Sequence, residues 1–280
     1  MTSGLLWMAI SAAAWAASDA LRKRLAAPMG AVALGWWLSV GAFPVFLAWV
    51  VLSGASAPTT AYWPWGLGSF ASTLSATLLM LAALAIADLG VAIPMLALTP
   101  VFSALLAWGA LGETLLLPAW VGVGLVVVGA VGLQLQGRRW RPDRGAVMMA
   151  GVALLWSLAA VFDKAAVDHA PVPTHAAIQV GASAAVLGPW LVLRGRARAL
   201  LPPRGHRVVA VAAVLVFGLA LGTQLLALQL EPVSRVETVK RAFGLISAIA
   251  VGRMAFGEPL TGMRVAGVAL MGVGAALVLG

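Results

Sequence analysis

The chain has little charge and no cysteine, and both absences narrow the classes of protein to which it can belong. Of its 280 residues, 10% are charged and 62% are hydrophobic. A soluble domain is about 25% charged and about 45–50% apolar, so this composition excludes an ordinary water-soluble protein. The absence of cysteine excludes disulfides, thiolate catalysis and Cys-ligated metal sites, and three histidines leave little for a histidine-based site.

Long hydrophobic runs account for nearly the whole chain. Glycine, proline and charged residues divide them into segments near the roughly 20 residues that a membrane-crossing helix needs. The expected spans are 4–24, 31–53, 64–86, 89–111, 117–136, 146–166, 172–193, 207–229, 233–253 and 261–279. We therefore expect an all-α, multi-pass protein of the cell inner (plasma) membrane, with ten transmembrane helices and loops too short to hold a soluble catalytic domain.

The net charge of +9 does not point to nucleic acid, because no basic soluble segment interleaved with aromatic residues is present. Most of the 18 basic residues instead follow odd-numbered spans, in the stretches 22–24, 138–144, 194–207 and 253–264. Loops rich in lysine and arginine face the cytoplasm. This bias predicts that both termini lie outside.

The two halves of the sequence resemble each other. Residues 8–23 (MAISAAAWAASDALRK) align with residues 149–164 (MAGVALLWSLAAVFDK) at an offset of 141. Gly112-Glu113 aligns with Gly257-Glu258 at an offset of 145. The alignment predicts repeats at 1–137 and 145–280, joined by a cytoplasmic linker at 138–144. Because five spans per repeat is an odd number, the second repeat enters the membrane inverted, and the halves are expected to surround a central cavity.

The segments LTPVFSALLAWGALGE (98–113) and KRAFGLISAIAVGRMAFGE (240–258) close the fourth and ninth spans. With the duplicated halves, they resemble the EamA branch of the drug/metabolite transporter superfamily. The resemblance implies a cavity lined by the first four helices of each half, with the fifth and tenth helices at the periphery. Well-known members keep both termini in the cytoplasm, which is the reverse of the charge bias here.

The ninth span contains three charged residues, Glu237, Lys240 and Arg241. Glu237 can reach Lys240 at i+3 and Arg241 at i+4, and the cluster starts within roughly 10 Å of the helix end. Each charge at a helix centre costs about 2.5–3.5 kcal/mol on insertion scales, so such charges usually face a cavity or a partner. Two interpretations stay open: a site for an anion or carboxylate, or an ion cluster that fixes helix packing.

The Lys-Arg pair also resembles the pair that holds phosphate in the triose-phosphate translocators of the same superfamily. Those proteins carry another lysine in the fourth helix. The corresponding stretch here, IPMLALTP (93–100), has no cation, which weakens a sugar-phosphate reading.

Asp19 and Glu237 are the candidates for coupling transport to protons. For Asp19 the alternative is an interfacial carboxylate paired with Arg22 or Lys23. Its repeat mate is Ala160, so the repeat does not favour either interpretation.

Other candidates come from the spans expected to line the cavity. Trp15 and Trp156 occupy equivalent positions and are expected to contact substrate, as are Thr223 and Gln224, whose more common role is hydrogen bonding between helices. Pro94 and Pro100 interrupt the fourth span and indicate either a hinge or a static kink.

Two further sets of residues repeat between the halves. Glu113 and Glu258 are interpreted as helix-end residues, Glu113 on the outer side and Glu258 on the inner side, that either cap a helix or bridge loops. Gly122, Gly129, Gly267 and Gly274 are interpreted as close-packing positions, and association of two copies as a homodimer is left open.

No enzyme motif, nucleotide-binding motif, metal site or cofactor site is found, so the chain is not expected to be an enzyme. The sequence predicts a secondary transporter of a small anionic or zwitterionic organic metabolite that works by alternating access. The alternative is a flippase or transporter of a lipid-linked headgroup. The expected partners are the small-molecule substrate and the lipid bilayer, with no nucleic acid.

Overall fold

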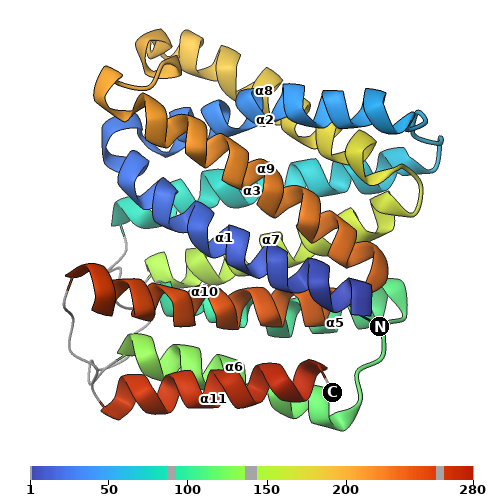
Figure 1. Ribbon diagram of the computed structural model, residues 1–280, viewed down its shortest axis with the longest axis vertical. Helices are drawn as coiled ribbons and strands as arrows, with labels where there is room; N and C mark the ends of the chain where they lie inside the picture. The colour runs from blue at the N-terminus through green and yellow to red at the C-terminus, as the bar shows by residue number, and fades with distance from the viewer. Residues whose placement is uncertain (1, 87–92, 136–143, 257–261, 280) are drawn as a thin grey trace. The chain divides into compact units, whose positions relative to one another are not determined.

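The computed structural model describes residues 2–86, 93–135, 144–256 and 262–279, which are predominantly helical (Figure 1). The α-helices are α1 (Thr2–Met29), α2 (Ala31–Ser53), α3 (Tyr62–Ile86), α5 (Thr99–Leu111), α6 (Leu117–Leu135), α7 (Arg144–Val167), α8 (Val172–Leu193), α9 (Arg207–Leu230), α10 (Val233–Phe256) and α11 (Gly262–Leu279). Three short 3₁₀ helices accompany them: η1 (Ile93–Leu98), η2 (Ala197–Leu200) and η3 (Arg204–His206).

The prediction of an all-α membrane protein is confirmed over these residues. Five helical segments are long and apolar enough to cross a membrane: Ser3–Arg22, Ala31–Ser53, Arg144–Val167, Val172–Leu193 and Ala197–Leu230. The bounds of α2 and α8 coincide with the predicted spans 31–53 and 172–193. The fourth predicted span is described only from Ile93 onward, so the count of ten helices stays a prediction.

The chain divides into two compact units, and each contains helices from both sequence repeats. Unit 1 comprises residues 1–70 and 163–229, and unit 2 comprises residues 71–162 and 230–280. The predicted repeats at 1–137 and 145–280 describe a duplication along the sequence, whereas the units describe packing. Most of the predicted linker at 138–144 lies outside the described residues.

In unit 1, α2 lies beside α8 (Figure 1), and two glycines of α8 allow aromatic rings of α2 to approach. A β-carbon at Gly181 would lie 3.0 Å from the Phe43 ring, and one at Gly188 would lie 2.6 Å from the Trp36 ring. The later residue of α2 meets the earlier residue of α8, so the two helices run antiparallel. An offset of 145 residues aligns Trp36 with Gly181 and Phe43 with Gly188. Exchanging each residue for its aligned partner in the other repeat therefore converts the Phe43–Gly181 contact into the Trp36–Gly188 contact.

In unit 2, α6 and α11 show the same relationship (Figure 1). A β-carbon at Gly122 would lie 2.5 Å from the carbonyl oxygen of Gly274, and one at Gly129 would lie 2.9 Å from that of Gly267. The repeat aligns Gly122 with Gly267 and Gly129 with Gly274. Exchanging each glycine for its aligned partner therefore converts the Gly122–Gly274 contact into the Gly129–Gly267 contact. In each unit, equivalent helices of the two repeats run antiparallel, which is the relationship that an inverted repeat requires.

The glycine contacts predict different effects for two glycines on α6. Gly122→Ala places a methyl group against backbone and should destabilise the protein by about 1–3 kcal/mol, the usual cost of overpacking. Gly124 has nothing within 4 Å of an added β-carbon, so Gly124→Ala should stabilise the helix by roughly 0.5–1 kcal/mol. Unfolding of the purified variants in detergent measures both effects, and equal effects would contradict the close packing of α6 on α11.

Candidate functional site

The three charged residues predicted to form a cluster lie together on α10, in unit 2. Lys240 Nζ donates a hydrogen bond to Glu237 Oε1, one helical turn away. Glu237 is 3% exposed, whereas the Lys240 side chain is 25% exposed. A buried carboxylate held by an ammonium group is the i+3 pair that the sequence predicts.

The Arg241 side chain reaches a residue that the sequence analysis did not select. Its Nη2 donates to Thr99 Oγ1 at 3.2 Å, and the Thr99 hydroxyl donates to the Leu96 carbonyl at 2.7 Å. The hydroxyl group therefore uses both its acceptor and its donor function. This bond links α10 to the first residue of α5.

A break in the helix preceding this contact positions Thr99. The chain runs as the 3₁₀ helix η1 up to Leu98 and as α5 from Thr99, with Pro100 in the first turn. Proline has no N–H and fits the first turn of a helix, which explains why α5 begins here. The second predicted hinge residue, Pro94, belongs to η1. Both prolines therefore lie where the 3₁₀ helix passes into α5, and a movement at this junction stays a prediction.

Helix α7 supports the same junction. The Ser157 hydroxyl is fully buried and lies 2.8 Å from the Ala153 carbonyl oxygen of its own helix and 3.0 Å from the Thr99 carbonyl oxygen, so the two acceptors share its one proton. The preceding residue, Trp156, is partly buried and packs against a core cluster that includes Met95 and Met149. Trp156 thus lies in the same unit as Lys240 and Arg241, next to a residue that fixes the start of α5.

Glu113 connects the loop after α5 to the N-terminus of α10. Its Oε2 accepts a hydrogen bond from the Val233 backbone N–H at 2.9 Å, and its Oε1 from the same group at 3.3 Å. A carboxylate at a helix N-terminus satisfies an orphan donor and interacts favourably with the helix dipole. The structure thus shows Glu113 in the capping role predicted for it, one turn before Glu237. Glu258 lies outside the described residues.

The remaining predicted residues belong to unit 1. The Trp15 ring packs edge-on against Phe217 at 6.0 Å between centroids, and the Arg22 guanidinium lies 5.1 Å from the Trp15 ring centroid. Arg22 also pairs with Asp19 at 3.7 Å, and the Asp19 side chain is 68% exposed. This is the pairing considered above as the alternative to proton coupling, and it does not test the coupling role itself.

Thr223 and Gln224 are buried in α9, with 4% and 6% exposure. The Thr223 hydroxyl donates to the Leu219 carbonyl of its own helix at 2.7 Å. The structure thus shows a local backbone bond for Thr223, and a role of either residue in substrate binding stays a prediction.

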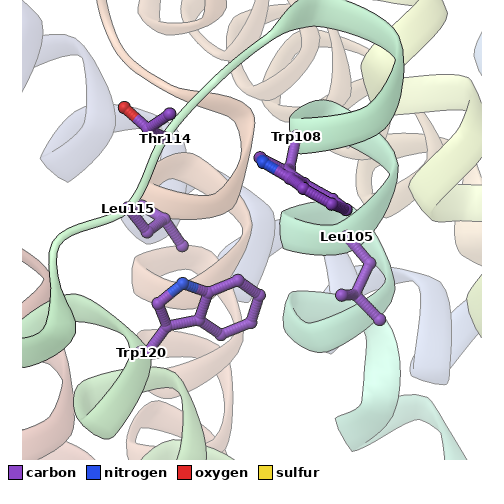
Figure 2. A pocket seen from close by; sticks show the side chains of 5 residues that line it. All are labelled: Leu105, Trp108, Thr114, Leu115 and Trp120. Carbon is purple, nitrogen blue, oxygen red and sulfur yellow. The ribbon is translucent and has the colours of Figure 1, made fainter.

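An apolar recess lies between α5 and α6 (Figure 2). Its volume is about 350 Å³, and it is lined by Leu105, Trp108, Thr114, Leu115 and Trp120. No ionisable side chain and no predicted site residue lines it. In a membrane protein an apolar recess of this kind suits hydrocarbon, and it does not suit a charged metabolite.

Sequence reasoning missed two sets of polar residues. Thr99 and Ser157 form the support of Arg241, and a hydrophobic-span analysis does not distinguish them from other small polar residues. A second cluster in unit 1 contains Asp163 and His175. The sequence feature that could have pointed to this cluster is Asp163, because it is a carboxylate inside the predicted span 146–166. Among the described residues, no group of three or more His, Cys, Asp or Glu residues is placed to hold a metal ion.

Comparison with known proteins identifies the family. The model of the EamA-like transporter family matches residues 2–135 and again residues 143–280. The chain belongs to the EamA-like transporter family. Its two matches correspond to the two repeats found in the sequence, and membership makes it a membrane transporter of the drug/metabolite transporter superfamily.

A solved structure has the same fold. The crystal structure of another protein superposes on this chain with a TM-score of 0.86. The two sequences are 19% identical, and the superposition covers 100% of this chain and 98% of the other. No curated protein matches the sequence. The family and the fold are thereby established, and the substrate is not.

Capping by Glu113 predicts a local contribution to stability. Glu113→Ala removes the acceptor from the first turn of α10 and should destabilise the protein by about 0.5–2 kcal/mol. Thr114→Ala, at the exposed neighbouring position, should change stability by no more than about 0.5 kcal/mol. Thermal unfolding of both variants measures the difference, and an unaffected Glu113→Ala protein would show that the cap is energetically unimportant.

Proposed function

We propose that this EamA-family protein is a secondary active transporter of a small anionic or zwitterionic organic metabolite and that it works by alternating access. The observation that supports the proposal is the cluster on α10. Two cations and one carboxylate lie within five consecutive residues, next to the break between η1 and α5. Broken helices next to charged groups are typical of substrate sites in transporters with inverted repeats.

The charges of the cluster favour an anionic group on the substrate. Glu237 and Lys240 bind each other, and Arg241 adds a second positive charge whose guanidinium bonds a neutral hydroxyl on Thr99. A carboxylate or phosphate is a stronger acceptor for guanidinium than a hydroxyl and accepts two parallel N–H bonds. A substrate anion would therefore compete with Thr99 for the Arg241 guanidinium, with Lys240 as the second cation of the site.

This exchange connects binding to conformational change. The bond from Arg241 to Thr99 holds α10 to the start of α5, next to Pro94 and Pro100. Substrate that takes over the Arg241 guanidinium releases that bond. The break between η1 and α5 is then the element that moves as the two inverted repeats change the side to which the site opens.

Coupling to protons is proposed to involve Glu237, with Asp19 as the second candidate. Glu237 is buried against Lys240, so adding a proton to it would remove the negative charge from their ion pair and increase the positive charge of the site. Transport in liposomes with an imposed pH gradient tests both residues. Glu237→Gln should lose the dependence on the gradient, and unchanged dependence in both Glu237→Gln and Asp19→Asn would remove both residues from coupling.

A ligand screen tests the substrate site directly. The full-length protein is purified and its melting temperature is measured with carboxylates, phosphates and amino acids. A ligand at about 100 times its Kd stabilises the folded state by about 2.7 kcal/mol. Arg241→Lys keeps the charge but loses the fork geometry, and it should weaken binding by about 10- to 100-fold, the effect of losing about 1.5–3 kcal/mol.

Arg235→Gln is the matched control, because Arg235 lies on the same helix but pairs with Glu231 at 3.3 Å. This variant should bind the ligand as the parent does. Equal ligand shifts in the parent, Lys240→Ala and Arg241→Lys would show that the cluster only fixes helix packing. Stabilisation by lipid-linked headgroups alone would favour the flippase instead.

A further inference from the structure

A second buried polar cluster lies in unit 1 and joins α3, α7 and α8. Tyr62 Oη lies 2.9 Å from His175 Nδ1, and His175 Nε2 lies 3.1 Å from Asp163 Oδ1. The Ser69 hydroxyl donates to the same Asp163 oxygen. Tyr62 and His175 are 0% exposed, Ser69 is 1% exposed and Asp163 is 9% exposed.

Two arrangements of protons fit the hydrogen bonds. In the unprotonated form, the Tyr62 hydroxyl donates to Nδ1 of a neutral imidazole and the Nε2–H of that imidazole donates to Asp163. In the protonated form, an imidazolium donates to both residues. Ser69 donates a second hydrogen bond to the same carboxylate oxygen, so each N–H and O–H donor of these four side chains has an acceptor. In the unprotonated form the cluster carries one negative charge. One added proton would neutralise it and would belong to the Asp163–His175 pair as a whole.

In the part of the chain that the structure describes, Asp163 makes no ion pair with a lysine or an arginine. Lys164 follows Asp163 in the sequence, and its Nζ donates to the Leu228 carbonyl at 2.9 Å. On α8, the Gln179 amide donates to the Gly66 carbonyl of α3 at 2.8 Å. Apolar side chains complete the surroundings, with Ala166, Ala170, Trp65 and Ile178 packed around Tyr62.

The cluster lies close to one end of its helices. Tyr62 is the first residue of α3, Asp163 is four residues before the end of α7, and His175 is the fourth residue of α8. At 1.5 Å per residue, Asp163 and His175 are about 6 Å from the helix ends. The adjoining loops contain Asp168 and His169, and Thr59 bonds the His169 carbonyl at 3.1 Å. By the distribution of basic residues, this end faces the outside.

We propose that Asp163 and His175 form a proton-binding site that takes up one proton from the outer aqueous face. In the unprotonated form, Asp163 accepts from both Ser69 and His175 and so holds α3 and α8 to α7. A proton on His175 removes Nδ1 as the acceptor for Tyr62, and a proton on Asp163 weakens the bonds that it accepts from Ser69 and His175. Proton uptake at either residue therefore changes contacts between the three helices. The link to transport rests on the proposed function, whereas proton binding itself does not.

Histidine NMR tests the site without any substrate. The full-length protein is labelled with ¹⁵N-histidine in lipid nanodiscs, and His169→Gln and His206→Gln leave His175 as the one histidine. The ring nitrogen signals are followed between about pH 5 and pH 8, the range in which histidine titrates. The proposal predicts a single-proton transition in this range. Ring signals that stay constant would show a static hydrogen-bond cluster and would overturn it.

Two variants test the partners in opposite directions. Asp163→Asn removes the negative charge that favours the protonated imidazole, and it should lower the midpoint of the transition by about one pH unit or more. Tyr62→Phe removes the donor that favours the neutral imidazole and should raise the midpoint. If Asp163→Asn does not fold, Ser69→Ala serves in its place, because a carboxylate with one donor fewer binds its proton more tightly and should also raise the midpoint. Midpoints equal to that of the parent in all folded variants would overturn the proposal.

The outcomes separate this proposal from the proposed function. A protein that binds ligands through Lys240 and Arg241, but whose His175 does not titrate, keeps the transporter function and loses the proton site. A titrating His175 in a protein that binds no anionic metabolite keeps the proton site and removes the proposed substrate class.

Discussion

The hydrocarbon interior of a membrane offers no hydrogen bonds and no counter-ions, and this constraint explains how the charged side chains buried in the spans are placed. Polar side chains buried in the spans need partners from the protein itself. In unit 2 this requirement explains why Lys240 binds Glu237 and why Arg241 binds Thr99. In unit 1 it explains the chain of bonds from Tyr62 through His175 to Asp163. In both units, polar partners join helices that are distant in the sequence, at positions where a change of partner can change the packing.

The apolar contacts follow a different rule, which is that equivalent helices of the two repeats pack on each other. Gly122 and Gly274 bring the backbones of α6 and α11 together, and in unit 1 Gly188 makes room for the Trp36 ring. Glycine is needed at these positions because any larger residue would meet backbone or ring atoms. The duplicated sequence therefore encodes its own packing surfaces twice, once in each orientation.

The sequence predicted the helices well, because long apolar runs and the breaks between them are local properties. It also predicted the Glu237–Lys240 pair, since residues three apart share a helix face, and the capping role of Glu113. It could not predict that Arg241 reaches Thr99, because 142 residues separate the two. His175 was missed for the same reason. Its partners come from α3 and α7, and a count of three histidines in the chain gives no sign of how they are surrounded.

The inversion of the repeats is the claim on which the mechanism depends, and cysteine accessibility tests it most directly. The chain has no cysteine, so Ala57→Cys, in the connection after α2, and Ala197→Cys, at the start of η2 in the connection after α8, each introduce a single thiol. These connections follow equivalent helices, and inversion places them on opposite sides of the membrane. A membrane-impermeant thiol reagent applied to intact cells should label Ala57→Cys but not Ala197→Cys, and permeabilised cells should be labelled in both variants. Labelling of both variants, or of neither, in intact cells would contradict the inverted arrangement.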